Sequence, residues 1–162
     1  MNYLTRAGVS DGECVFCAKV KSADDAANHI LYRGERCFVT LNLFPYNNGH
    51  LMVVPNRHTP ALESLDEAEA GEMMHVTQMA VQVLKAAFNP QGFNIGINQG
   101  QVAGAGIAAH LHQHVVPRWG GDTNFTSVIG ETRVIPEWID QTYARLHEAW
   151  VAQFPPSTKV HS

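Results

Sequence analysis

His110-Leu111-His112-Gln113-His114-Val115-Val116 places three imidazoles at a spacing of two in an apolar run that ends in β-branched residues. Alternate side chains of a β-strand share one face, so this spacing predicts a strand whose three rings point the same way, about 6–7 Å apart. Each buried ring nitrogen needs a hydrogen-bond partner, so burying three such rings in a hydrophobic core costs free energy. The stretch indicates either a polar strand face in solvent or a site where neutral imidazole acts as ligand or nucleophile, and its apolar flanks favour the site.

The composition is that of one globular domain. The chain has 162 residues, of which 45% are hydrophobic and 16% charged, with a formal net charge of −4 and three cysteines. It lacks the basic footprint that binds nucleic acid, so no nucleic-acid partner is expected. No apolar run is long enough to span a membrane, and the start of the chain does not resemble a signal peptide. We therefore expect a cytoplasmic protein with no membrane partner and reduced thiols.

Short apolar segments on both sides of the histidines predict an α+β domain with a mainly antiparallel sheet. Asp66 is a suitable N-cap for the clearest helix, residues 66–88, in which apolar residues recur every three or four positions. A second helix is expected over residues 136–151, with Pro136 near its first turn. The expected strands cover residues 30–33, 37–43, 50–55, 92–98 and 110–116, the last of which stops at Pro117.

The middle imidazole is the candidate for nucleophilic attack on phosphorus. Neutral His112 can form a covalent phosphoramidate, provided that a backbone carbonyl fixes the tautomer by binding its other ring nitrogen. His114 lies one step along the same strand face and is placed to donate to the leaving oxygen. The glycine-rich loop of residues 100–106, which includes Gly104 and Gly106, can offer backbone N–H groups to phosphate, although it is not a P-loop.

A C-x-x-C pair, Cys14 and Cys17, forms the second candidate site. By itself such a pair is compatible with redox chemistry, with metal binding or with chance. Tetrahedral zinc needs two further ligands, for which the candidates are His50, His58 and His110. A closed site of two cysteines and two histidines leaves no position for water, so that its zinc would be structural.

Two other residues interrupt or occupy the predicted strands. Asn42 interrupts an apolar strand just before a turn-rich loop, where it either binds a ligand hydroxyl or caps the loop. Cys37 alternates with core-like residues, so we expect it to be a buried small hydrophobe.

The motif His110-x-His112-x-His114-Val115-Val116 resembles the signature of the histidine triad (HIT) superfamily of nucleotide hydrolases and transferases. Residues 42–55 and 92–125 are similar to the same superfamily, most of all to its diadenosine tetraphosphate phosphorylase-like proteins. The resemblance implies a HIT-like α+β fold with about five antiparallel strands, and a homodimer. It implies a HIT domain over residues 14–150, between an N-terminal arm (1–13) and a partly disordered C-terminal tail (151–162).

The resemblance also implies roles for individual residues. His112 would be the nucleophile that accepts a nucleoside monophosphate, and His114 would bind phosphate and assist the leaving group. A structural zinc ion would be held by Cys14, Cys17, His58 and His110. An AMP-containing nucleotide would lie against Val15, Phe16 and Leu43 at the base, Asn42 at the ribose, and His50, Asn98, Gly104 and Gly106 near the phosphates.

Two departures from the family pattern leave the reaction open. Gln113 stands where the motif has an apolar residue, and Gly106 and Ile107 stand where many members have polar ones. The first hypothesis is cleavage of a phosphoanhydride in a dinucleoside polyphosphate such as diadenosine tetraphosphate, through a His112–AMP intermediate that phosphate or water resolves. The alternatives are a hydrolase of nucleoside phosphoramidates or adenylylated amines, and a zinc-stabilised nucleotide-binding module without turnover.

Overall fold

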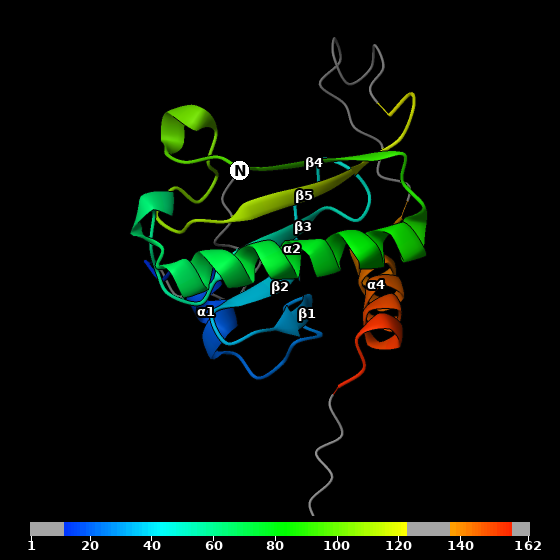
Figure 1. Cartoon of the computed structure of the whole chain (residues 1–162), viewed down its shortest axis with the longest axis horizontal. Coiled ribbons are helices and arrows are strands. Elements are labelled where there is room, and N and C mark those ends of the chain that lie inside the picture. Colours follow the sequence, from blue (N-terminus) through cyan, green and yellow to red (C-terminus); the bar gives the residue numbers. More distant parts are fainter. Residues whose placement is uncertain (1–11, 123–136, 157–162) are drawn as a thin grey trace, which may run out of the picture.

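A computed structural model describes residues 12–122 and 137–156 of the chain. The described part confirms the predicted α+β class, with five antiparallel strands and a long helix across one face of the sheet (Figure 1). None of the described helices is long and apolar enough to cross a membrane. The elements are α1 Val15–Lys21, β1 Ile30–Arg33, β2 Cys37–Leu41, β3 Leu51–Pro55, α2 Glu67–Phe88, β4 Gly92–Ile97, β5 Gln113–Arg118 and α4 Ile139–Gln153, with short 3-10 turns at Leu62–Ser64 and Gln101–Ala103.

The sheet has the order β1-β2-β3-β5-β4, so β5, which contains His114, lies between β3 and the edge strand β4. Its register pairs Met52 with His114 and Gly96 with His114. A strand flanked on both sides holds its backbone more firmly than an edge strand, because both rows of its hydrogen-bonding groups are paired. The sheet therefore fixes His114 between two neighbours.

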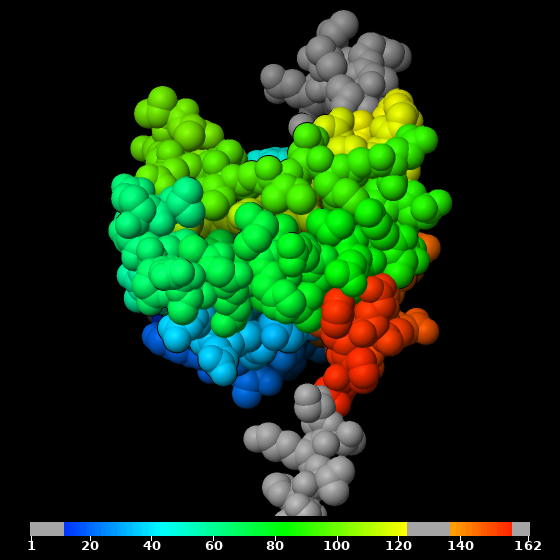
Figure 2. Space-filling view, in the orientation of Figure 1, coloured from blue at the N-terminus to red at the C-terminus, as the bar shows by residue number. Residues whose placement is uncertain are grey.

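Strand alternation divides the apolar residues between the two faces of the sheet. Cys37, Val39 and Leu41 of β2 face α2, which covers this side together with α4 (Figures 1 and 2). Phe38 of the same strand faces the other way and packs near α1. The helix-covered face carries the larger core, and the α1 face is left for the site.

The long helix begins and ends as the sequence predicts. Asp66 accepts a hydrogen bond from the Glu69 backbone N–H at 2.7 Å, and the Glu69 carboxylate accepts one from the Asp66 N–H at 3.0 Å, which is a capping box. The guanidinium of Arg57 also donates two bonds to the Glu69 carboxylate, at 2.8 and 2.7 Å. These bonds tie the segment after β3, which carries His58, to the start of α2.

Two elements, α1 and β5, differ from the expectation. The helix α1 was not predicted, because its seven residues are too few for a clear helical period. β5 begins only at Gln113, so His110 and His112 lie before the strand and the prediction of three rings on one strand is wrong for them. β5 also continues through Pro117 to Arg118, since beyond Val115 it pairs only with β4, and the Asn47 side chain donates to the Pro117 carbonyl at 3.2 Å.

The predicted helix over 136–151 corresponds to α4, which begins at Ile139 and ends at Gln153. Pro136 lies outside the described residues, as do most of the predicted arm and the end of the predicted tail.

Candidate active site and metal centre

The imidazole of His112 is buried and held by a single backbone contact. Its Nδ1 lies 2.9 Å from the carbonyl oxygen of His110, so Nδ1 carries the ring proton and donates a hydrogen bond to this oxygen. The lone pair is therefore left on Nε2. Burial lowers the pKa of His112, which keeps the ring neutral near pH 7. This is the tautomer and charge state of a nitrogen nucleophile.

A hydrogen bond from His50 determines the tautomer of His114, the third imidazole of the motif. The Tyr46 backbone N–H donates to His50 Nδ1 at 3.0 Å, so the proton of a neutral His50 lies on Nε2. That Nε2 lies 2.9 Å from His114 Nδ1 and donates to it, which leaves the His114 proton on Nε2. Burial, and next the nearby His112, lowers the pKa of His114 to about 4. A neutral donor ring thus lies beside His112, with 4.9 Å between the two ring centroids.

The fixed loop between β2 and β3 positions His50. Gly49 has φ +73°, and a Cβ there would come within 3.0–3.2 Å of Leu84 and Phe88 of α2. The Asn42 side chain accepts from the Phe44 N–H at 3.0 Å, and its amide lies 3.4 Å from His50 Nδ1. The loop-capping interpretation of Asn42 is therefore observed, whereas its contact with a ribose remains a prediction.

Four potential metal ligands converge at the start of α1. The ligand atoms of Cys14, Cys17, His58 and His110 all lie within 4.8 Å of one another. His110 donates from Nε2 to the Pro55 carbonyl at 2.9 Å, which leaves the lone pair of its Nδ1 facing the two sulfurs at 3.4 and 3.7 Å. Cys17 Sγ lies 3.2 Å from His58 Nδ1.

These separations fit tetrahedral zinc. Zn–S bonds of about 2.3 Å and Zn–N bonds of about 2.0–2.1 Å at a tetrahedral angle place a sulfur and a nitrogen about 3.6 Å apart. Burial and the adjacent Cys14 raise the pKa of the Cys17 thiol, a crowding of sulfurs that a bound cation would relieve. The donor set is closed, so the site fits a structural ion.

A narrow pocket brings together most of the residues predicted for a nucleotide. Its enclosed volume is about 30 Å³. Residues that the sequence predicted and that line it are Val15, Phe16, Asn42, Leu43, Gly106, His112 and His114. His50 lies behind His114 rather than in the lining. Asn98 and Gly104 lie near each other, with 4.0 Å between the Asn98 amide nitrogen and a Cβ built at Gly104, but neither lines the pocket.

Five other residues line the pocket and were not predicted to do so from the sequence: Lys19, Leu41, Tyr46, Met52 and Ile107. Lys19 follows Val15 and Phe16 at the spacing of one helical turn, so the missed helix α1 is the reason for its omission. Tyr46 packs against both His50 and His114, with ring centroids 4.8 and 5.7 Å away.

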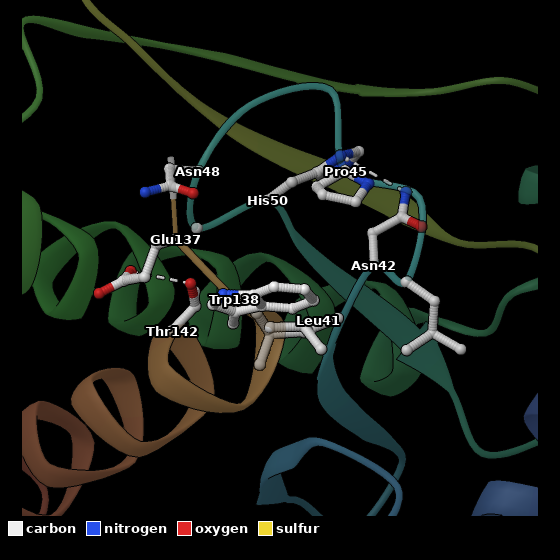
Figure 3. A pocket seen from close by; sticks show the side chains of 11 residues that line it. Leu41, Asn42, Pro45, Asn48, His50, Glu137, Trp138 and Thr142 are labelled. Carbon is white, nitrogen blue, oxygen red and sulfur yellow. Dashed lines mark hydrogen bonds between the residues drawn. The ribbon is translucent and has the colours of Figure 1, made fainter. Parts of the chain in front are cut away.

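A larger cavity of about 320 Å³ lies on the other side of the β2–β3 loop. Figure 3 shows Trp138 and Thr142 of the α4 region on one side of it and Asn42 and His50 on the other. Asn42 is common to both linings, whereas His50 lines the larger cavity and bonds to His114 of the narrow one. No pattern in the sequence indicated this second cavity.

The Gln113 side chain does not enter the catalytic face. Its amide donates to Thr77 Oγ1 of α2 at 2.6 Å, and Thr77 in turn donates to the Met73 carbonyl at 2.7 Å. Gln113 alternates with His114 along β5, so it points toward the helix-covered face. This departure from the motif therefore tethers β5 to α2, and its side chain lies on the other face of the sheet from His114.

Comparisons with known proteins agree with the geometry. The model of the HIT domain family matches residues 23–121. An AP-4-A phosphorylase of Mycobacterium tuberculosis is 43% identical over 159 residues, which cover 94% of this chain and 82% of that protein. The crystal structure of a Zn-bound histidine triad family protein from Mycobacterium smegmatis has a TM-score of 0.71 and 29% identity, and the match covers 87% of this chain and 95% of that one. An uncharacterized HIT-like protein of Methanocaldococcus jannaschii is 33% identical, over 67% of this chain and 81% of its own length.

Proposed function

Because the chain belongs to the histidine triad (HIT) family, we propose that it cleaves a phosphoanhydride of an AMP-containing dinucleoside polyphosphate through a covalent His112–AMP intermediate. The observation that carries the proposal is the His112–His110 contact, which leaves the lone pair on His112 Nε2, in a ring whose centroid lies 4.9 Å from that of His114. The similarity to an AP-4-A phosphorylase supports diadenosine tetraphosphate as the substrate.

In the first step, the His112 Nε2 lone pair attacks the α-phosphorus and forms an N–P bond. The P–O bond to the leaving group breaks, and its electron pair departs on the ATP oxygen. His114 donates a hydrogen bond from Nε2 to this oxygen, which needs no full proton transfer because polyphosphate is already a stable anion. The positive charge that develops on the His112 ring is held by the Nδ1–H bond to the His110 carbonyl.

In the second step, an oxygen of phosphate or water attacks the same phosphorus. The N–P bond breaks, and its electron pair returns to His112 Nε2. Attack by phosphate gives ADP, and attack by water gives AMP and releases the surplus proton to solvent. Backbone N–H groups around Gly104 and Gly106, together with Asn98, hold the remaining phosphate oxygens in this proposal.

The nucleoside half occupies the narrow pocket in the same proposal. Val15, Phe16 and Leu43 contact the base and Asn42 contacts the ribose.

Zinc, when bound by Cys14, Cys17, His58 and His110, supplies a structural crosslink between α1 and the segments around His58 and His110. The chain's own residues then do the chemistry. The structural role rests on the closed donor set, which offers four protein ligands and no position for water.

The test compares the parent protein with His112→Ala and with His75→Ala, a control at an exposed histidine of α2. Each is incubated with diadenosine tetraphosphate with and without phosphate, and the products are separated. We expect ATP with ADP in phosphate, ATP with AMP in its absence, no turnover by His112→Ala, and full turnover by His75→Ala. An alkaline quench followed by mass spectrometry should detect AMP on a peptide that contains His112 of the parent.

Equal turnover by His112→Ala and the parent would remove the nucleophile assignment. Faster release of AMP from an adenosine phosphoramidate than from the dinucleotide would assign the chain to the hydrolases of amine-linked nucleotides. Binding of AMP with no adduct and no turnover would leave a nucleotide-binding module.

We also propose that two copies pair along β4. This strand is an edge of the sheet and pairs only with β5 among the described strands. Asn94, Ile95 and Gly96 are exposed, including 48% of the large apolar Ile95, and an unpaired apolar edge is a template for a second chain. Light scattering after size exclusion should give a dimer for the parent and a monomer for Ile95→Lys, and a monomeric parent would end this proposal.

A further inference from the structure

Asp122 closes a tight turn after β5, beside the β2–β3 loop. Its backbone N–H donates to the Trp119 carbonyl at 3.2 Å, and the third residue of the turn, Gly121, has φ +80°, a conformation that favours glycine. The turn returns the Asp122 carboxylate to the guanidinium of Arg118, which donates to both carboxylate oxygens at 2.7 Å. Only 11% of the Asp122 side chain is exposed, and such a bidentate pair is held more firmly than an ordinary surface ion pair.

The same carboxylate reaches the β2–β3 loop through Asn47. The Asn47 amide donates to Asp122 Oδ2 at 2.8 Å and to the Pro117 carbonyl of β5 at 3.2 Å, so both of its amide hydrogens are used. Its Oδ1 accepts the backbone N–H of Asn48 at 3.1 Å. Since β5 pairs with β3 only as far as Val115, the Asn47 side chain joins the last part of β5 to the loop in place of a neighbouring strand.

Asn47 begins the turn that carries His50. Its carbonyl accepts the His50 backbone N–H at 3.2 Å, and the preceding residue, Tyr46, donates its own N–H to His50 Nδ1 at 3.0 Å. The fixed position of Asn47 therefore keeps the Tyr46 N–H within reach of the His50 ring. That bond leaves the His50 proton on Nε2, which donates to His114 Nδ1 at 2.9 Å. A continuous series of contacts thus connects Asp122 with the ring of His114.

We propose that Asp122 is a positioning residue of the active site, which through Asn47 keeps the ring proton of His114 on Nε2. Its effect on turnover rests on the proposed function, in which this Nε2 donates to the leaving oxygen. A donor that points at the leaving oxygen only part of the time stabilises the transition state less, so the contribution of Asp122 belongs to kcat. The nucleoside contacts Val15 and Phe16 of α1 in the same proposed function, so KM should depend little on Asp122.

Two substitutions of the same residue separate this role from a purely structural one. Asp122→Ala removes every bond of the carboxylate. Asp122→Asn keeps one oxygen, which can still accept from Asn47, but its amide nitrogen faces a donor of Arg118, so both variants lose the ion pair. Both should therefore be less stable than the parent, and only Asp122→Ala should lose the link to the loop. Asp25→Ala is the matched control, because Asp25 accepts at 2.7 Å from Arg33 of β1, the other edge strand of the sheet.

We expect kcat for diadenosine tetraphosphate to fall about fivefold in Asp122→Ala with KM within about twofold, to recover most of this loss in Asp122→Asn, and to stay unchanged in Asp25→Ala. Asn47→Ala should reproduce the fall, and combining it with Asp122→Ala should add little, because the two residues act through one contact. Imidazole nitrogen NMR shifts of the full chain, measured without nucleotide, should show His114 protonated at Nε2 in the parent and in Asp122→Asn. In Asp122→Ala they should show a mixture of the two tautomers.

Unchanged nitrogen shifts of His114 in a folded Asp122→Ala, or a kcat in this variant equal to that of Asp122→Asn, would overturn the inference and leave the proposed function standing. If Asp122→Ala does not fold, the nitrogen shifts and kcat of Asn47→Ala, each compared with the parent, decide in its place. A parent without turnover removes the proposed function, and the nitrogen shifts then decide the inference alone.

Discussion

His50 Nε2 lies 2.9 Å from His114 Nδ1, and the backbone N–H of Tyr46 holds the opposite nitrogen of the His50 ring. Through these bonds His50, which lies outside the histidine motif, orients the ring of His114, which belongs to the motif. His50 is itself fully buried and lies at the end of a loop fixed by Gly49 and Asn42. The β2–β3 loop therefore determines which nitrogen of His114 carries the proton.

Replacing His50 should impair turnover more than stability alone explains. In His50→Leu the donor to His114 Nδ1 is lost, so the His114 proton is no longer confined to Nε2, and we expect kcat to fall at least about tenfold. His50→Gln, whose amide can donate to His114, should recover part of the loss. The rates are compared with melting temperatures, and a variant that is folded and fully active would show that His114 needs no such partner.

The buried imidazoles make stability depend on pH. His114 has a pKa of about 4 in the folded chain, below the ordinary 6.5 of an unfolded histidine, so between these values the unfolded chain binds more protons. The free energy of unfolding should be constant above pH 6.5 and should fall by about 2–3 kcal/mol as the pH drops from 6.5 to 4. Burial of His110 and His112 acts in the same direction.

Urea denaturation between pH 4 and pH 8 measures this slope. It should become smaller in His114→Asn and remain unchanged in His75→Ala, the exposed control. Glu69, whose hydrogen bonds with Arg57 lower its pKa to about 2, acts in a separate window, because its stabilising effect is lost only as the pH falls from about 4.5 to 2. An identical slope in His114→Asn and the parent would contradict the neutral, buried His114.

The metal centre makes a separate prediction. Metal analysis of the purified chain should find about one zinc ion per chain, and Cys17→Ser should lose it. Loss of a structural ion costs several kcal/mol, which for a chain of this size lowers the melting temperature by about 10 °C. Cys37→Ala is the control, since Cys37 is buried in the helix-covered core and lies outside the cluster. It should keep the zinc even if it is less stable, and a zinc-free parent would refute the site.

The tether between Gln113 and Thr77 is tested by a double-mutant cycle. Thr77→Val removes the acceptor and leaves the Gln113 amide buried without it, so we expect a loss of about 1–3 kcal/mol in the free energy of unfolding. Adding Gln113→Leu should restore much of this loss, because both polar partners are then gone. Turnover by Gln113→Leu should stay within a few-fold of the parent. A large loss of kcat in a stable Gln113→Leu would place this side chain in the chemistry after all.

The sequence predicted those parts that depend on local patterns. The α+β class, the HIT-like fold, the α2 helix with its Asp66 cap and the burial of Cys37 are confirmed. The four predicted zinc ligands are indeed clustered, although Cys14 and Cys17 are 96 and 93 residues from His110. In these cases a residue pattern, or a family motif, specifies the answer without knowledge of the neighbours.

The errors concern features that tertiary packing decides. A strand pattern cannot reveal that His110 turns away to face two sulfurs, which delays the start of β5 to Gln113. The polar Gln113 could be interpreted only with knowledge of Thr77 on the opposite layer. Lys19 was missed because α1 is short, and nothing in the chain's periodicity places a lysine among pocket residues.

His110 makes two contacts through different atoms, since its ring faces the sulfurs and its carbonyl oxygen accepts a hydrogen bond from His112 Nδ1. If the proposed zinc ion is bound, a chelator that removes it from a still-folded chain should let the His110 carbonyl oxygen move, so that the orientation of the His112 ring is no longer fixed. Zinc supply in the growth medium would then change the fraction of competent molecules rather than the turnover of each one.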